Sequence, residues 1–86
     1  MRIYMQQAPD IEAAPRYVQL LLEQDLLGGW TLYRESGKEG GRATLRRQIF
    51  VDRDAAIEAF EHARDLQLKK GFKIMITEGM EAPRAH

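Results

Sequence analysis

Residues 16–50 decide the fold, and they read RYVQLLLEQDLLGGWTLYRESGKEGGRATLRRQIF. Apolar and polar side chains alternate in residues 16–24, 30–34 and 43–50, which is typical of half-buried strands. Two glycine pairs, at residues 28–29 and 40–41, separate these segments and permit the chain to reverse direction. The stretch therefore predicts three consecutive antiparallel strands in a meander.

The residues on either side of this stretch predict two further strands and one helix. Weak alternation at residues 2–6 and an apolar run at residues 72–77 each indicate a strand. Residues 53–70 are rich in good helix formers, with Asp52 as the expected N-cap and Gly71 as the expected C-cap residue. The buried stripe of this helix is expected to comprise Ala56, Phe60, Ala63 and Gln67, flanked by Ile57 and Leu66.

The predicted order β, β, β, β, α, β is that of an α+β domain. We expect an antiparallel β-sheet, built around the meander, with one long α-helix packed on one face. The 86 residues suit a single domain over residues 1–86. We expect its core to span about residues 16–77 and residues 78–86 to form a flexible tail.

Composition excludes several classes of function. The chain has no cysteine, so disulfides, thiolate metal sites and cysteine nucleophiles are absent. No segment approaches the ~18 apolar residues of a membrane span, and the N-terminus does not resemble a signal peptide. We expect a cytoplasmic protein with no membrane partner. There is no nucleophile–base set and no second histidine near His62, so we expect no enzymatic activity, no cofactor and no metal site.

The hairpin at residues 30–50 carries the candidate binding residues, although the whole chain balances 13 basic against 13 acidic residues. Its basic side chains are the candidates for phosphate contacts: Arg34, Lys38, Arg42, Arg46 and Arg47. The expected loop comprises Ser36, Gly37, Gly40 and Gly41. Its glycines either bring backbone amides close to an anion or supply positive φ. Tyr33 is the candidate for a stacking aromatic. Strand alternation sends Arg46 and Arg47 to opposite faces, so the five basic side chains do not all converge on one site. The alternative to anion binding is that these side chains pair with Glu35 and Glu39 on the same hairpin.

The order of elements and several short motifs resemble the WGR domain, a module of poly(ADP-ribose) polymerases and of small bacterial proteins. The resemblance covers residues 16–74. It rests on Tyr17-Val-Gln-Leu, Leu27-Gly-Gly-Trp-Thr-Leu-Tyr-Arg34, Ser36-Gly-Lys-Glu-Gly40, Phe50, Ala55-Ala56 with Phe60, and Lys69-Lys70-Gly71-Phe72. In the polymerases this module contacts DNA at a break. The resemblance therefore implies the same fold and a DNA-binding role, without the reaction of the polymerase.

The tripeptide that names the family is changed in this chain. Its positions read Ser36-Gly37-Lys38, so only the glycine is kept. Ser36 cannot stack on a base or sugar, and Lys38 retains the charge without the planar fork of arginine. We therefore predict a non-catalytic nucleic-acid-binding module, with DNA the expected nucleic acid, that holds phosphates through its basic hairpin.

The alternative is a protein–protein interaction module of a bacterial regulatory protein, without DNA binding. An exposed apolar patch around Met5, Leu26, Leu27 or Met75 would favour that alternative. An uncovered edge strand at residues 2–6 or 73–77 would favour pairing with a second chain.

Overall fold

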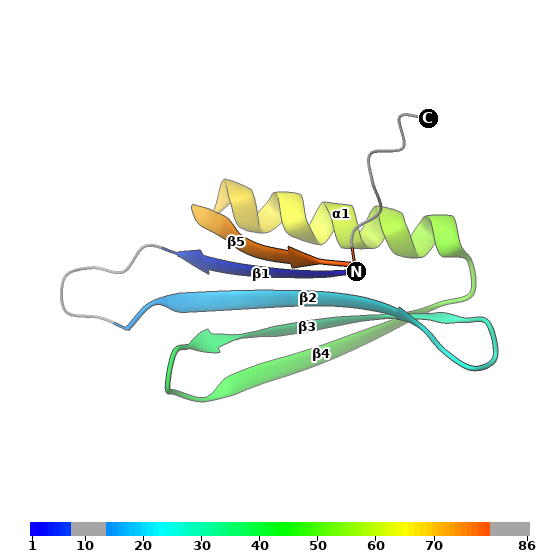
Figure 1. The fold of residues 1–86 in the computed structure, drawn as a ribbon, viewed down its shortest axis with the longest axis horizontal. Helices are drawn as coiled ribbons and strands as arrows, with labels where there is room; N and C mark the ends of the chain where they lie inside the picture. The colour runs from blue at the N-terminus through cyan, green and yellow to red at the C-terminus, as the bar shows by residue number, and fades with distance from the viewer. Residues whose placement is uncertain (8–13, 80–86) are drawn as a thin grey trace.

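A five-stranded antiparallel sheet carries a single helix on one face (Figure 1). The computed structural model describes residues 1–7 and 14–79. Its elements are β1 (Arg2–Gln7), β2 (Arg16–Gln24), β3 (Trp30–Lys38), β4 (Ala43–Phe50), α1 (Arg53–Lys69) and β5 (Phe72–Glu78). The strand order is β4-β3-β2-β1-β5. The α+β class and the meander are confirmed, although α1, at 17 residues, is not a long helix.

The ends of α1 follow from the residues that flank it. The Asp52 side chain accepts a hydrogen bond from the Ala55 backbone N–H at 3.1 Å, which satisfies one of the free donors of the first turn. Lys70 is the C-cap residue of α1. Gly71 follows it with a φ of 95°, the left-handed conformation that favours glycine. The predicted helix boundaries are therefore confirmed to within one residue.

The β3–β4 hairpin is longer than its alternation predicts. Ser36 and Gly37 belong to β3, because they pair with Val18 and Tyr17 on β2 and with β4 on the other side. The prediction that both residues lie in a loop is wrong. The reversal is confined to residues 39–42, where Gly40 has a φ of 77°. β3 therefore stays paired to its end, with β4 as far as Gly37 and with β2 as far as Lys38.

The core lies between α1 and the face of the sheet that α1 covers. Phe60 and Met5 are fully buried, and the remaining core residues are Ile3, Val18, Leu20, Leu22, Leu32, Ala56 and Phe72. β1 contributes to this core from a position between β2 and β5. The core thus extends further toward the N-terminus than residue 16, and residues 2–6 are not an edge strand.

Two side-chain contacts link segments of the sheet and the helix that are distant in sequence. The Arg53 guanidinium at the start of α1 lies over the Trp30 ring, 5.9 Å from its centroid, and Trp30 packs against the core. At the end of β5, Glu78 forms an ion pair with Arg2 at 2.7 Å. Glu78 is therefore a strand residue and not part of the expected tail, whose residues 80–86 lie outside the described residues.

Gly37 occupies a position with no room for a side chain. A Cβ on Gly37 would clash with the Arg42 carbonyl oxygen, a backbone atom of the turn that precedes β4. We predict that Gly37→Ala lowers the free energy of unfolding by about 1–3 kcal/mol, because the hairpin backbone must shift to admit the methyl group. Urea unfolding followed by circular dichroism measures this change.

Gly41→Ala is the matched control for this prediction. A Cβ on Gly41 would lie 3.5 Å from the Lys38 carbonyl oxygen, an ordinary van der Waals contact, and its φ is not positive. Its stability should stay within about 0.5 kcal/mol of the wild type. Equal stability of the two variants would contradict the close approach at Gly37.

Candidate functional site

Strand alternation sorts the charges of the hairpin onto two faces. Trp30, Leu32 and Arg34 share the face that α1 covers, so this face changes from apolar to basic along β3. The register places Arg34 opposite Arg46 and Ser36 opposite Thr44. Glu35 lies between these residues in sequence and therefore faces the other side of the sheet.

Two adjoining cavities lie between this basic end of the sheet and α1. The first has a volume of about 370 Å³, and its polar lining includes Arg16, Arg34, Ser36, Lys38, Arg42, Thr44, Gln67 and Lys70. The second has a volume of about 460 Å³ and is lined by Leu32, Arg34, Arg46, Arg47, Gln48, Ala59, His62, Ala63 and Leu66. We call the two together the basic groove, since Arg34 borders both. Neither lining contains an aspartate or a glutamate.

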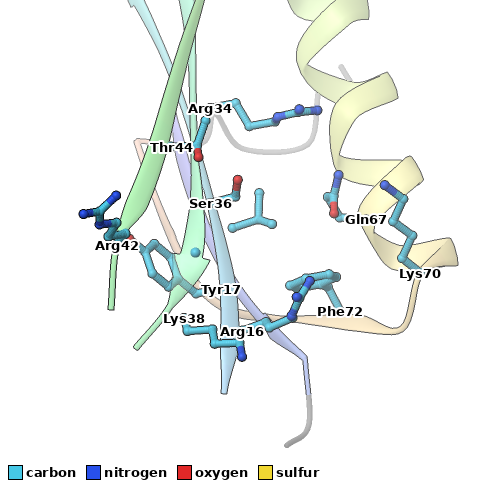
Figure 2. Close-up of a pocket in the computed structure, with 12 residues that line it drawn as sticks. Arg16, Tyr17, Arg34, Ser36, Lys38, Arg42, Thr44, Gln67, Lys70 and Phe72 are labelled. Atoms are coloured by element: carbon cyan, nitrogen blue, oxygen red, sulfur yellow. The ribbon is translucent and has the colours of Figure 1, made fainter. Parts of the chain in front are cut away.

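Figure 2 shows how the side chains lie around the first cavity. Arg34 extends from β3 toward α1, and Gln67 reaches from the helix toward the sheet. Ser36 lies on the sheet side of the cavity, and Lys70 stands beside Gln67 on the helix side. The guanidinium of Arg42 turns away from the cavity. The cavity is therefore surrounded by donors from β2, β3 and α1, with Phe72 of β5 forming an apolar part of its wall.

The basic groove places like charges together without compensation. Arg34 and Arg46 are directly opposite each other on neighbouring strands, an arrangement that destabilises a sheet when both residues are charged. Within residues 1–7 and 14–79, neither arginine forms an ion pair. A bound anion would relieve this repulsion, because phosphate and carboxylate groups accept hydrogen bonds from guanidinium.

The carboxylates of the hairpin are engaged on the open face of the sheet. Glu35 accepts a hydrogen bond from the Tyr17 hydroxyl at 2.7 Å. Glu39 accepts hydrogen bonds from the Tyr4 hydroxyl and from the Gln6 amide. The rings of Tyr4 and Tyr17 stack with their centroids 5.9 Å apart. In the described part of the chain, Glu35 and Glu39 thus bind tyrosines, and pairing with the basic side chains of the hairpin is not observed.

The predicted site residues divide between the two faces. Arg34, Lys38 and Arg46 border the basic groove, as does Ser36, and Arg42 borders it with its side chain directed outward.

Arg47 borders the second cavity, but its register opposite Tyr33 places both side chains on the open face. Tyr33 is half-buried there, beside Leu21 and Leu45 around a cavity of about 230 Å³. Among the predicted loop glycines, Gly37 borders the first cavity, while Gly40 and Gly41 lie in the turn.

Seven residues that line the first cavity were not predicted as site residues: Arg16, Tyr17, Val18, Thr44, Gln67, Lys70 and Phe72. Two of them carried a signal. Arg16 stands two residues before Val18 and therefore shares its face, where an arginine interrupts an apolar series. Gln67 occupies the fourth position of an otherwise apolar helix stripe. The inclusion of Lys70 and Phe72 depends on how α1 and β5 are placed relative to the hairpin.

No protein-family model, curated protein or solved structure matches this chain. In the described residues, no helix is long and apolar enough to cross a membrane. The same residues contain no cluster of three or more histidine, aspartate or glutamate side chains that could hold a metal ion.

The tyrosine–glutamate pairs of the open face generate a prediction about alkaline pH. The hydrogen bond to Glu35 is the main cause that raises the pKa of Tyr17 from 10.0 to about 12. The folded-state pKa of Tyr17 lies above the unfolded value. The stabilisation of the folded state by the Tyr17–Glu35 hydrogen bond is therefore complete below pH 10.0 and is lost as pH rises toward 12. We predict that Glu35→Gln moves the Tyr17 pKa back toward 10, and ultraviolet titration of tyrosinate absorbance measures the change.

Tyr17→Phe identifies the phenol that titrates late in this experiment. Removing it should eliminate the highest tyrosinate transition, while the transition of Tyr4, whose pKa is raised by Glu39, remains. An unchanged high transition in Glu35→Gln would mean that Glu35 does not hold the Tyr17 hydroxyl in solution.

Proposed function

We propose that this chain is a non-catalytic nucleic-acid-binding module whose basic groove holds the phosphates of the nucleic acid. The observation that carries the proposal is the juxtaposition of Arg34 and Arg46 in a lining without any carboxylate. Charged donors that repel one another and lack a protein partner are suited to an anionic ligand. The anionic groups of a nucleic acid that arginine and lysine side chains contact are its phosphates.

The extent of the groove favours a polyanion over a single small anion. Basic side chains line both cavities, and they come from β2, β3, β4 and the C-terminal cap of α1. Arg34 joins the two cavities, so positive charge continues from one to the other. A chain of phosphates at regular spacing can occupy such a row, whereas one phosphate would leave most of the donors unused. The resemblance to the WGR domain supports DNA as the nucleic acid.

The proposal assigns no reaction to the groove. The aliphatic hydroxyls that line the first cavity belong to Ser36 and Thr44, the Tyr17 hydroxyl donates to Glu35, and no histidine or carboxylate lines that cavity to act as a base. His62 borders the second cavity, which contains no hydroxyl nucleophile. The groove therefore offers donors for binding and lacks the arrangement that nucleophilic catalysis requires.

A salt-dependent binding titration tests the proposal. Fluorescence anisotropy is measured with labelled oligonucleotides over a range of salt concentrations, for the wild type, Arg34→Gln and Arg46→Gln. Binding of the wild type should weaken steeply with salt, because each neutralised phosphate releases counterions. Each substitution should weaken binding and lower the log–log salt slope by about 0.7–0.9.

Lys73→Gln is the matched control, since it also removes one charge. Lys73 is exposed on β5, opposite Gln6 on the open face, and does not border the groove. Its salt slope should equal that of the wild type. Absence of binding at low salt, or an equal loss in Lys73→Gln, would overturn the assignment of the groove.

One observation favours the alternative, a protein–protein interaction module. Leu26 and Leu27 are fully exposed at the β2–β3 turn, where the Asp25 side chain accepts hydrogen bonds from the Leu27 and Gly29 backbones. Met5, which was expected to contribute to an apolar patch, is instead fully buried. Association through these leucines would be insensitive to salt and would be lost in Leu26→Ser/Leu27→Ser. The basic groove has the larger set of converging side chains, so nucleic-acid binding is the function we propose.

A further inference from the structure

Gln67 is a buried polar side chain that the protein leaves without a partner. It is only 5 % exposed, and within the described residues no hydrogen bond involves its side-chain amide. The amide atoms are not sealed from solvent, because no described side-chain nitrogen or oxygen is both inaccessible and unpaired. Figure 2 shows Gln67 directed from α1 into the first cavity, toward which Arg34 extends from β3. Its hydrogen-bonding capacity is thus available to a ligand in the cavity.

The chemistry of an amide indicates what that ligand presents. A glutamine side chain offers two donors and an acceptor, whereas phosphate oxygens at neutral pH only accept. A ligand that satisfies Gln67 therefore carries a donor and an acceptor side by side. The edges of nucleobases have this arrangement, and glutamine commonly binds them through both groups.

The rest of the cavity provides for the other parts of a nucleotide. Phe72 is 9 % exposed and forms an apolar part of the wall, where the flat face of a base finds a contact. Arg34 and Lys70 border the same cavity as Gln67, and their charges suit a phosphate. Base edge, base face and phosphate each have a matching group within one cavity of about 370 Å³, which is within the range of small-molecule sites.

Access to Gln67 distinguishes a paired from an unpaired base. Proteins read base edges within a duplex by inserting a protruding helix or ribbon into a groove of the DNA. Gln67 does not protrude, because it is recessed between α1 and the sheet. Only a base that leaves its stack can enter such a cavity, as bases of single strands and loops do.

We propose that the first cavity binds one unpaired nucleotide of a single-stranded segment, with its base edge hydrogen-bonded to Gln67. Phe72 contacts the base, and Arg34 and Lys70 hold the adjoining phosphate. The inference rests on the proposed nucleic-acid function and adds the class of nucleic acid. Gln67 is then the specificity-determining residue, while the arginines supply affinity without sequence preference.

The test compares labelled oligonucleotides of equal length in anisotropy titrations. The probes are single-stranded homopolymers of A, C and T as DNA, their RNA counterparts, and a blunt DNA duplex. The wild type should bind single strands more tightly than the duplex and should favour one base by roughly tenfold. Gln67→Leu should abolish this base preference while leaving the salt slope unchanged, because it removes the amide without removing a charge.

Gln24→Leu is the matched control, because it removes the same amide from an exposed position on β2 that borders neither cavity of the groove. It should retain the base preference of the wild type. Leucine is a good helix former, so Gln67→Leu is expected to fold, and circular dichroism with urea unfolding verifies this.

The outcomes separate the two proposals. Equal binding of duplex and single strands, with Gln67→Leu matching the wild type on every probe, would overturn the unpaired-nucleotide site and leave nucleic-acid binding intact. No binding of any probe at low salt would overturn the nucleic-acid function itself and the nucleotide site with it. Loss of base preference in Gln24→Leu as well as in Gln67→Leu would overturn the assignment of the base contact to Gln67.

Discussion

The alternation of side chains along β3 is the constraint on which the rest of the structure depends. A strand exposes successive residues on opposite faces, so Leu32, Arg34 and Ser36 share one face while Glu35 lies on the other. A shift of register by one residue would bring Glu35 beneath α1 and turn Arg34 outward. The apolar core, the basic groove and the tyrosine–glutamate pairs of the open face all depend on this single register.

The helix converts this alternation into a groove. Phe60 and Ala56 are fully buried against the apolar part of the covered face. Burial of the Phe60 side chain stabilises the fold by roughly 1.5–3 kcal/mol. Once this part of the helix is anchored, the straight geometry of α1 carries Gln67 over the part of the sheet that β3 has made basic. Core packing therefore positions the polar residues of the groove, although they contribute little to the core themselves.

The groove carries an electrostatic cost in a domain with little stability to spare. A chain of 86 residues buries a smaller share of its surface than larger domains do, so its net stability is expected to be modest. The unpaired charges of Arg34 and Arg46, which lie opposite each other, reduce it further. A phosphate-bearing ligand that engages these groups would add to the stability of the folded state, because it binds that state alone.

The sequence alone determined the local structure well. Residues 16–24 and 43–50 were predicted with the boundaries that β2 and β4 have, because period-two alternation between glycine turns is a local signal. The Asp52 cap and the C-terminal glycine of α1 are equally local. The position of β1 inside the sheet, between β2 and β5, was not predicted, since its alternation is weak and these two partners are far apart in sequence. The strand pairing of Ser36 and Gly37 was missed because β2 and β4 impose it against a glycine-rich composition.

The candidate site shows the same division. The basic residues of the hairpin were visible in the sequence, and alternation alone indicated that Arg46 and Arg47 diverge. Which of them meet α1 was decided by the tertiary structure, because the helix can cover either face of a sheet whose alternation is known. Arg16, Gln67 and Lys70 approach Arg34 only when β2, β3 and the end of α1 come together. Local periodicity assigns a residue to a face, whereas its neighbours across the groove depend on contacts between segments distant in the chain.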